Sequence, residues 1–121
     1  MQIATPMADA LGRYLDLSTL ELKLTARNMA NVDTPGYRTV GFDFAAEMAR
    51  SLESPRQTSN AAPSPRVGEV GGLLERPDGN DVSMDREGMN MAEAQLRFRA
   101  GVELLKREFT RVMDAIHEDQ K

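Results

Sequence analysis

The sequence predicts a mainly α-helical fold in which two long terminal helices pair as an antiparallel coiled-coil hairpin. A long irregular middle segment joins them and has room for a short helix and short strands. Apolar residues recur at steps of three and four near both ends of the 121-residue chain, which is the helical period. Proline, glycine and small polar residues collect between these stretches. Aromatic residues make up only 5% of the chain, so a thick hydrophobic interior is not expected.

Composition excludes several classes of function. Cysteine is absent, which excludes a disulfide framework and thiolate metal centres. The single histidine, His117, lies near a polar chain end, so catalytic triads and histidine metal sites have almost no material, and we expect no catalytic residue, metal or cofactor. The net charge of −4 disfavours nucleic acid and acidic membrane surfaces. No apolar run reaches the ~18 residues of a membrane span. Residues 1–11 also lack the features of a cleaved leader.

The first helical segment is predicted over residues 5–32. Thr5 is a suitable N-cap and Pro6 suits the first helical position, where its missing N–H is not needed. The apolar stripe then consists of Ala8, Leu11, Leu15, Ser18, Leu22, Thr25, Met29 and Val32, of which six are apolar. Residues 20–24 also alternate with period two, as a strand would, but the flanking residues favour a helix.

A turn and a short helix are predicted over residues 33–52. Asn31 suits a left-handed helix end, and Thr34-Pro35-Gly36-Tyr37 has the pattern of a type II turn. The short amphipathic piece that follows has four candidate anchors, which are Phe42, Phe44, Met48 and Leu52. Residues 53–76 are interpreted as a linker rich in Pro, Gly and Ser, within which Val67–Leu74 either pairs as a short strand or stays irregular.

The last segment, residues 77–118, combines a second turn with the most regular helical pattern. Ser83 is the expected cap, and no proline follows it, so one helix of ~50 Å is predicted. Its stripe consists of Met84, Gly88, Met91, Gln95, Phe98, Val102, Leu105, Phe109, Val112 and Ile116. Gly88 and Gly101 each weaken the helix by ~1 kcal/mol, and either a close neighbouring helix or drift at a tolerant site accounts for them.

Both helices also carry apolar residues on a second face. Leu17, Leu20 and Leu24 oppose the first stripe, and Met89, Ala92, Leu96 and Ala100 oppose the last one. A hairpin of two helices covers only one stripe of each, so we expect other chains to cover the rest. The alternative is that the middle segment folds back as a lid.

Two motifs resemble those of the bacterial flagellar axial proteins, the family of rod, hook and hook-associated proteins. The first motif consists of Asn28, Ala30, Asn31, Thr34, Pro35, Gly36 and Tyr37. The second consists of Asp78, Gly79, Asn80 and Val82, and together with the following helix it is similar to the proximal rod branch of that family. The resemblance covers roughly residues 7–44 and 77–117.

The resemblance implies a non-enzymatic subunit of a tubular rod that transmits torque and is exported by the flagellar type III apparatus without a cleaved leader. Its implied neighbours are other copies of the chain, the rod-base adaptor FliE and the rod proteins FlgC and FlgF, with no nucleic acid and no membrane insertion. The expected assembly interface consists of Leu11, Leu15, Leu22, Met29, Leu17, Leu20, Leu24, Met91, Phe98, Val102, Leu105, Phe109, Val112 and Ile116. The alternative function is a soluble helical-hairpin adaptor or chaperone that binds other proteins.

Overall fold

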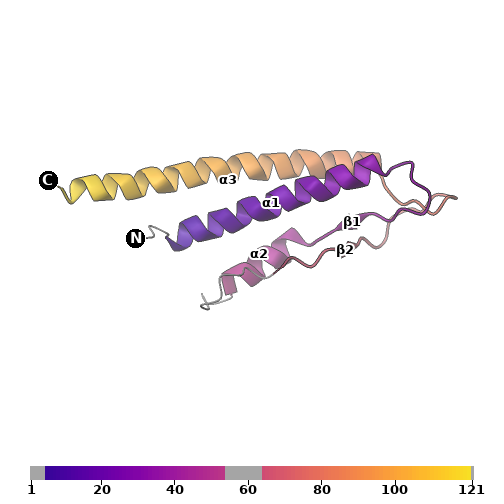
Figure 1. The fold of residues 1–121 in the computed structure, drawn as a ribbon, viewed down its shortest axis with the longest axis horizontal. Helices are drawn as coiled ribbons and strands as arrows, with labels where there is room; N and C mark the ends of the chain where they lie inside the picture. The colour runs from indigo at the N-terminus through magenta and orange to yellow at the C-terminus, as the bar shows by residue number, and fades with distance from the viewer. Residues whose placement is uncertain (1–4, 54–63, 121) are drawn as a thin grey trace.

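A computed structural model describes residues 5–53 and 64–120. Along the chain it contains α1 (Pro6–Ala30), β1 (Val40–Gly41), α2 (Phe44–Glu53), β2 (Gly68–Glu69) and α3 (Met84–Glu118). Helices α1 and α3 lie side by side and antiparallel along the long axis of the molecule (Figure 1). The predicted fold class, a hairpin of two long terminal helices, is therefore confirmed.

The ends of α1 follow local side-chain chemistry. The Thr5 hydroxyl accepts a hydrogen bond from the Ala8 N–H (3.0 Å) and donates one to Glu108 of α3 (2.8 Å), so it caps one helix and joins the other. At the far end, Asn31 has a φ of −106°, and the left-handed conformation predicted for it is wrong. The Asn31 side chain donates instead to the Arg27 carbonyl (2.8 Å), which satisfies the last turn without a left-handed residue.

Apart from Leu11, the buried positions of the seam between α1 and α3 are small or polar rather than large and apolar. On α1 the buried seam positions, seven residues apart, are Leu11, Ser18 and Thr25. On α3 they are Glu87, Ala94, Gly101 and Glu108, none of which belongs to the predicted stripe. A Cβ placed on Gly101 would lie 2.8 Å from Leu15 Cδ2, so the two helices approach closely there. Close helix approach therefore accounts for Gly101, whereas Gly88 has open space around it.

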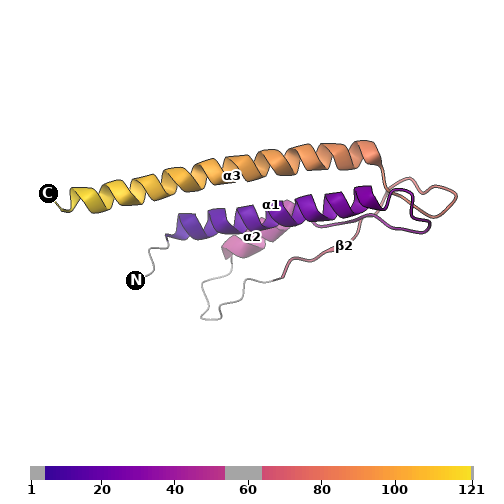
Figure 2. The ribbon, with the colours of Figure 1, turned by 45° about the horizontal axis from the view of Figure 1, so that its top comes forward.

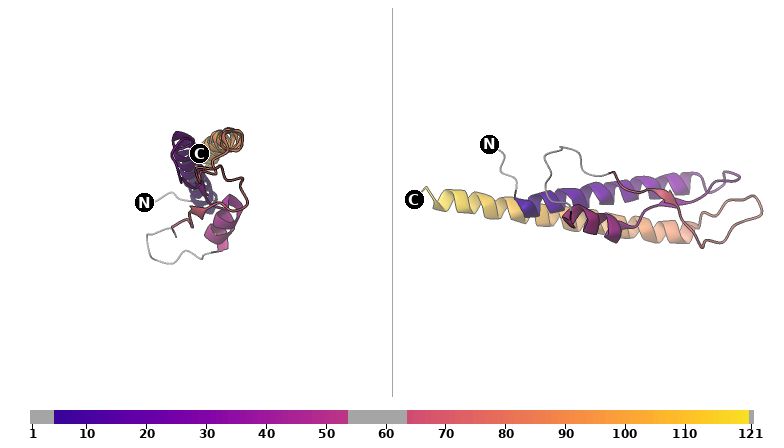
Figure 3. Two further views of the ribbon diagram at one scale, coloured as in Figure 1. Left: turned by 90° about the vertical axis from the view of Figure 1, so that its right-hand side faces the viewer. Right: turned by 90° about the horizontal axis from the view of Figure 1, so that it is seen from below.

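The middle segment folds back onto the hairpin. Helix α2 and the two strands lie together beside the hairpin when it is viewed along its length (Figure 3). The Phe44 ring packs edge-on against Tyr14 of α1, with 5.3 Å between ring centroids, and the Arg97 guanidinium lies 4.3 Å from the Phe44 centroid. Leu17 of α1 is only 1% exposed, so the chain itself covers this part of the second stripe of α1. Leu52, predicted as an anchor, is 65% exposed and does not serve as one, because it lies on the outer side of α2.

Polar contacts fasten the middle segment to itself. Strands β1 and β2 pair antiparallel, with Val40 opposite Glu69 and Gly41 opposite Gly68. The buried Glu47 carboxylate of α2 accepts a hydrogen bond from the Arg66 N–H (3.1 Å), and Arg50 donates to the Ser64 carbonyl (2.9 Å). These bonds hold the segment that leads into β2 against α2. Residues 54–63 of the predicted linker lie outside the described residues.

Helix α3 is longer than its partner at one end. Thr5 is level with Glu108, and α3 continues from there to Glu118 (Figure 2), which corresponds to about 15 Å of helix. Phe109 and Met113 in this part are 52% and 50% exposed.

Candidate functional site: interlocked turns and an uncovered apolar face

The two motifs singled out in the sequence form two tight turns at the end of the hairpin where α1 stops and α3 begins. In the first turn the Tyr37 N–H donates to the Thr34 carbonyl (3.2 Å), and Gly36 has a φ of 74°, as a type II turn requires. In the second turn the Gly79 N–H donates to the Arg76 carbonyl (2.9 Å), and Gly79 has a φ of 87°. Residues 31–37 and 76–82 are called the turn clasp below.

The two turns of the clasp lock into each other. The fully buried Asn80 side chain donates to the carbonyls of Asn31 and Thr34, both at 2.9 Å, and accepts from the Val82 N–H at 2.8 Å. The Gly36 N–H donates to the Asp78 carbonyl (2.8 Å). A Cβ on Gly79 would lie 3.3 Å from the Gly36 Cα, so the two backbones nearly touch. The clasp therefore fixes where α3 starts relative to where α1 ends.

Charged residues outside the motifs complete the clasp. Arg76 donates to the carbonyls of Val32 and Val82 and so bridges both turns. The buried Asp81 carboxylate accepts from the Thr39 N–H (2.6 Å) and lies 3.6 Å from Arg38. Sequence reasoning missed both roles, although the position of Arg76 directly before the second turn was a usable signal.

Asn28 ties α1 to the strand pair and to α3. Its side-chain amide donates to the Val40 carbonyl (2.8 Å) and its oxygen accepts from the Val40 N–H (3.1 Å), so it pairs with β1 as a neighbouring strand would. The same amide also donates to Glu87 of α3 (3.1 Å), and its oxygen accepts from the Tyr37 hydroxyl (2.9 Å). At 2% exposure, Asn28 is therefore a buried amide with every hydrogen-bonding group satisfied.

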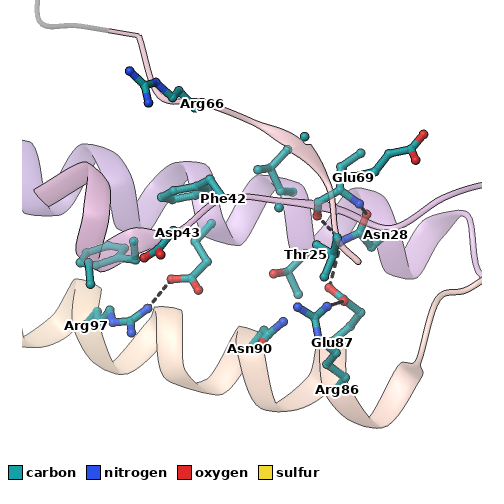
Figure 4. Close-up of a pocket in the computed structure, with 18 residues that line it drawn as sticks. Thr25, Asn28, Phe42, Asp43, Arg66, Glu69, Arg86, Glu87, Asn90 and Arg97 are labelled. Atoms are coloured by element: carbon teal, nitrogen blue, oxygen red, sulfur yellow. Dashed lines mark hydrogen bonds and ion pairs between the residues drawn. The ribbon is translucent and has the colours of Figure 1, made fainter. Parts of the chain in front are cut away.

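A groove of about 620 Å³ runs between α1, α3 and the strand pair (Figure 4). Its charged walls are largely paired, with Arg97 2.7 Å from Glu21 and Arg86 2.7 Å from Glu87. Across residues 5–53 and 64–120, no group of three or more His, Cys, Asp or Glu side chains could hold a metal ion. The groove is thus lined by polar contacts that connect α1, α3 and the strand pair.

Three buried carboxylates in these contacts have a lowered pKa. Burial would raise the pKa of Asp81, but the Thr39 N–H and Arg38 together hold it below its ordinary value. The pKa of Glu47 is lowered by the Arg66 N–H and by Arg50. The pKa of Glu108 is lowered by hydrogen bonds from Arg111 and Thr5.

These directions predict acid sensitivity. A lowered folded-state pKa contributes stability above the unfolded value, and this contribution is lost as the pH falls through the folded value. We expect the unfolding midpoint in urea to fall as the pH drops from about 5 through 3.8, the ordinary value for Asp81, and below it. The Asp81→Asn variant should flatten this dependence, whereas Asp33→Asn, at an exposed position, should not. Equal slopes for all three proteins would contradict the role of Asp81.

The seam between α1 and α3 has two flanks, and most of the predicted assembly residues lie on only one of them. Residues three positions beyond the seam residues, such as Glu21, Asn28 and Arg97, line the groove. Residues four positions beyond lie on the opposite flank. This flank carries no charge and is called the uncovered face; its residues are Leu15, Leu22, Met29, Met91, Phe98, Leu105 and Val112, continued on α3 by Met84, Val102, Phe109 and Ile116. Phe98, Met84 and Phe109 are 38%, 44% and 52% exposed, and the other eight are half-buried.

The remaining predicted interface residues lie elsewhere. Leu11 and Leu17 are buried within the chain, while Leu20 and Leu24 are half-buried. Leu24 lines the groove. The second stripe predicted on α3 is exposed, with Met89 at 74% and Leu96 at 69%.

Comparison with curated proteins decides the family, although no family model matches the chain. A flagellar basal body rod protein FlgB from Cereibacter sphaeroides is 35% identical, over 93% of this chain and 97% of the relative. The chain belongs to the FlgB family. FlgB proteins of Salmonella typhimurium and Escherichia coli K12 are 29% and 27% identical, each over 84% of this chain and 86% of the relative. The chain is therefore a flagellar basal body rod protein, and the resemblance of its two motifs to the axial proteins is confirmed.

The family gives the geometry its context. A basal body rod protein works alongside other rod proteins, and its structure has to offer surfaces to them. In the described ranges, no helix is both long enough and apolar enough to cross a membrane.

Proposed function

We propose that the chain is a non-enzymatic structural subunit that packs by helix–helix contacts into the tubular, torque-transmitting proximal rod. The observation that carries this proposal is the uncovered face. Because small and polar residues form most of the α1–α3 seam, the large apolar side chains lie on one flank, where Met84, Phe98 and Phe109 are exposed and the other eight are half-buried. Uncharged apolar faces of this kind mark surfaces that other proteins cover.

The division of labour along the chain follows from this. The segments 5–32 and 77–118 form one coiled-coil domain that packs against neighbours, and residues 33–52 form the turn and short helix that steady it. Residues 53–76 connect the two halves. Other copies of the chain, FliE, FlgC, FlgF and the type III export apparatus are the proposed partners, with the rod spanning the periplasm. The rod-protein names of the relatives and the apolar helix flank support this arrangement.

The decisive variant is Phe109→Glu in the part of α3 beyond the start of α1. Since Phe109 is 52% exposed, a charge there should leave the fold within about 1 kcal/mol of the wild type, while it places a carboxylate in an apolar interface. We expect cells that carry only this variant to lose swimming in soft agar and to yield no complete rods. Circular dichroism of the purified variant should match that of the parent.

The conservative variant Phe109→Leu is the matched control and should swim, because it keeps the surface apolar. Normal swimming and normal rod yield with Phe109→Glu would show that this face is not an assembly surface. If the chain were instead a soluble adaptor, neither the wild-type chain nor the variant would be found in purified basal bodies.

A further inference from the structure

The second turn of the clasp contains a chemically reactive dipeptide. Asp78-Gly79 is the one place in the sequence where glycine follows aspartate, and no asparagine is followed by glycine. In a flexible chain the amide nitrogen that follows an aspartate can attack the carboxyl carbon of its side chain. Glycine favours this attack most, because it has no side chain to obstruct the approach and its backbone turns freely. An unfolded chain of this protein is therefore more labile at Asp78 than at its other aspartates.

The reaction balances with no reagent other than water. A bond forms between the Gly79 nitrogen and the Asp78 Cγ, while the bond from Cγ to one oxygen of the protonated carboxyl breaks. That oxygen leaves as water, together with the amide hydrogen and the carboxyl proton, and a five-membered succinimide ring remains. Water then opens the ring at one of its two carbonyl carbons. One opening restores aspartate, and the other gives isoaspartate, in which the main chain runs through the former side-chain Cβ and Cγ.

In the folded chain the clasp holds both polar groups of the peptide bond between Asp78 and Gly79. The Asp78 carbonyl accepts from the Gly36 N–H at 2.8 Å, and the Gly79 N–H donates to the Arg76 carbonyl at 2.9 Å. The Asp78 carboxylate itself accepts from the Asn80 N–H at 3.0 Å. Ring closure requires this peptide plane to turn, so these bonds have to break first. Hydrogen bonds and not burial provide the protection, since Asp78 is exposed.

Isoaspartate does not fit the closed clasp. It adds one carbon atom to the main chain beside Gly79, where even a Cβ would lie 3.3 Å from the Gly36 Cα. The longer main chain also displaces Asn80, whose buried side chain has to reach the carbonyls of Asn31 and Thr34 at 2.9 Å. A chain that isomerises before it folds therefore loses the contacts that lock the two turns together.

We propose that Asp78 is a site of spontaneous isoaspartate formation whose reaction is confined to chains in which the turn clasp is open. The closed clasp suppresses the reaction, and isoaspartate at Asp78 in turn prevents the clasp from closing. This inference stands apart from the proposed function, because it depends only on the clasp and on water.

The first test compares folded and unfolded samples of the purified full-length chain. One sample is kept in buffer and the other in guanidinium chloride, at the same temperature and the same slightly acidic pH. Methylation by an isoaspartyl methyltransferase measures the amount of isoaspartate, and mass spectrometry of peptides locates it. We expect isoaspartate at Asp78 to accumulate about tenfold or more faster in guanidinium chloride, because a folded chain reacts only from its small open population. Asp78→Glu should abolish the signal, since the six-membered ring forms far more slowly.

The second test opens the clasp without changing the reactive dipeptide. Asn80→Ala removes the side chain that locks the two turns, and under folding conditions it should raise the rate at Asp78 about threefold or more. The matched control is Asn90→Ala, the same substitution in α3 outside the clasp, and it should leave the rate unchanged. Circular dichroism shows whether both variants keep their helices. If Asn80→Ala loses its helices, the comparison of folded and unfolded wild type decides the proposal.

Refolding tests the consequence of the modification. After dilution from guanidinium chloride, chains with isoaspartate at Asp78 should remain sensitive to protease, while unmodified chains of the same sample become resistant. The proposal is overturned by equal rates in the folded and unfolded wild type, by isoaspartate mainly at another aspartate, or by an unchanged rate in a helical Asn80→Ala variant. It is equally overturned if chains with isoaspartate at Asp78 become as protease-resistant as unmodified ones.

Discussion

Replacing Asn28 by leucine should lower the free energy of unfolding by about 3–5 kcal/mol, enough to unfold a small helical hairpin at moderate temperature. Leucine has the same number of side-chain heavy atoms, branched at the same carbon, so the expected loss comes from unmade hydrogen bonds and not from a cavity. The N–H and carbonyl of Val40 and the Tyr37 hydroxyl would lose their partners, and the buried Glu87 carboxylate would lose one of its two. Urea unfolding followed by circular dichroism measures the effect.

A second asparagine of the same motif gives the matched control. The side chain of Asn31 makes only local, exposed hydrogen bonds to Arg27 and Thr34, so Asn31→Leu should cost about 1 kcal/mol or less. If Asn28→Leu and Asn31→Leu lowered the free energy of unfolding by similar amounts, the buried hydrogen bonds of Asn28 would not be important for stability.

Enlarging Gly101 should be the second severe change, and enlarging Gly88 should be harmless. In Gly101→Leu, even the Cβ would lie 2.8 Å from Leu15 Cδ2 and 3.0 Å from Tyr14 Cδ1, so these side chains would have to shift or α1 and α3 would have to move apart. We expect a loss of about 3 kcal/mol in the free energy of unfolding. In Gly88→Leu nothing lies within 4 Å of the new Cβ, and better helix propensity should add up to about 1 kcal/mol.

Thermal unfolding of the two variants under identical conditions provides the comparison. The two changes in the free energy of unfolding should have opposite signs. This difference is more informative than either value, because both variants introduce the same side chain into the same helix. A stabilised Gly101→Leu would mean that the hairpin seam is looser than the Leu15 contact indicates.

The sequence predicted both long helices, because caps such as Thr5 and Ser83 and a steady apolar period act locally. It also placed both turns, since Gly36 and Gly79 follow residues that favour those turns. It did not predict which flank of α3 would face α1. The period marks where large apolar residues recur, but the seam formed instead where Ala94 and Gly101 allow the closest approach. Burial of Glu87 and Glu108 on a seam runs against composition rules and depends on tertiary partners.

The interlocking of the two turns could not be predicted for a similar reason. Asn80 was recognised as a turn residue, yet the function of its side chain is to satisfy carbonyls of Asn31 and Thr34, which are 49 and 46 positions away. Nothing local to either motif specifies such a pairing. Only the folded hairpin brings the two stretches together.

The hydrogen bond from Thr5 to Glu108 spans 103 positions of a 121-residue chain, and that separation governs the order in which folding can occur. Helix α1 has no helix to pack against until α3 has formed. Contacts between distant segments form late, because a long loop must close first. A chain that emerges from a narrow passage with its amino terminus first would hold an unpaired α1 until its last third had emerged. Because the paired residues of α1 and α3 are up to 103 positions apart, the hairpin can close only when the segment that forms α3 is available to pack.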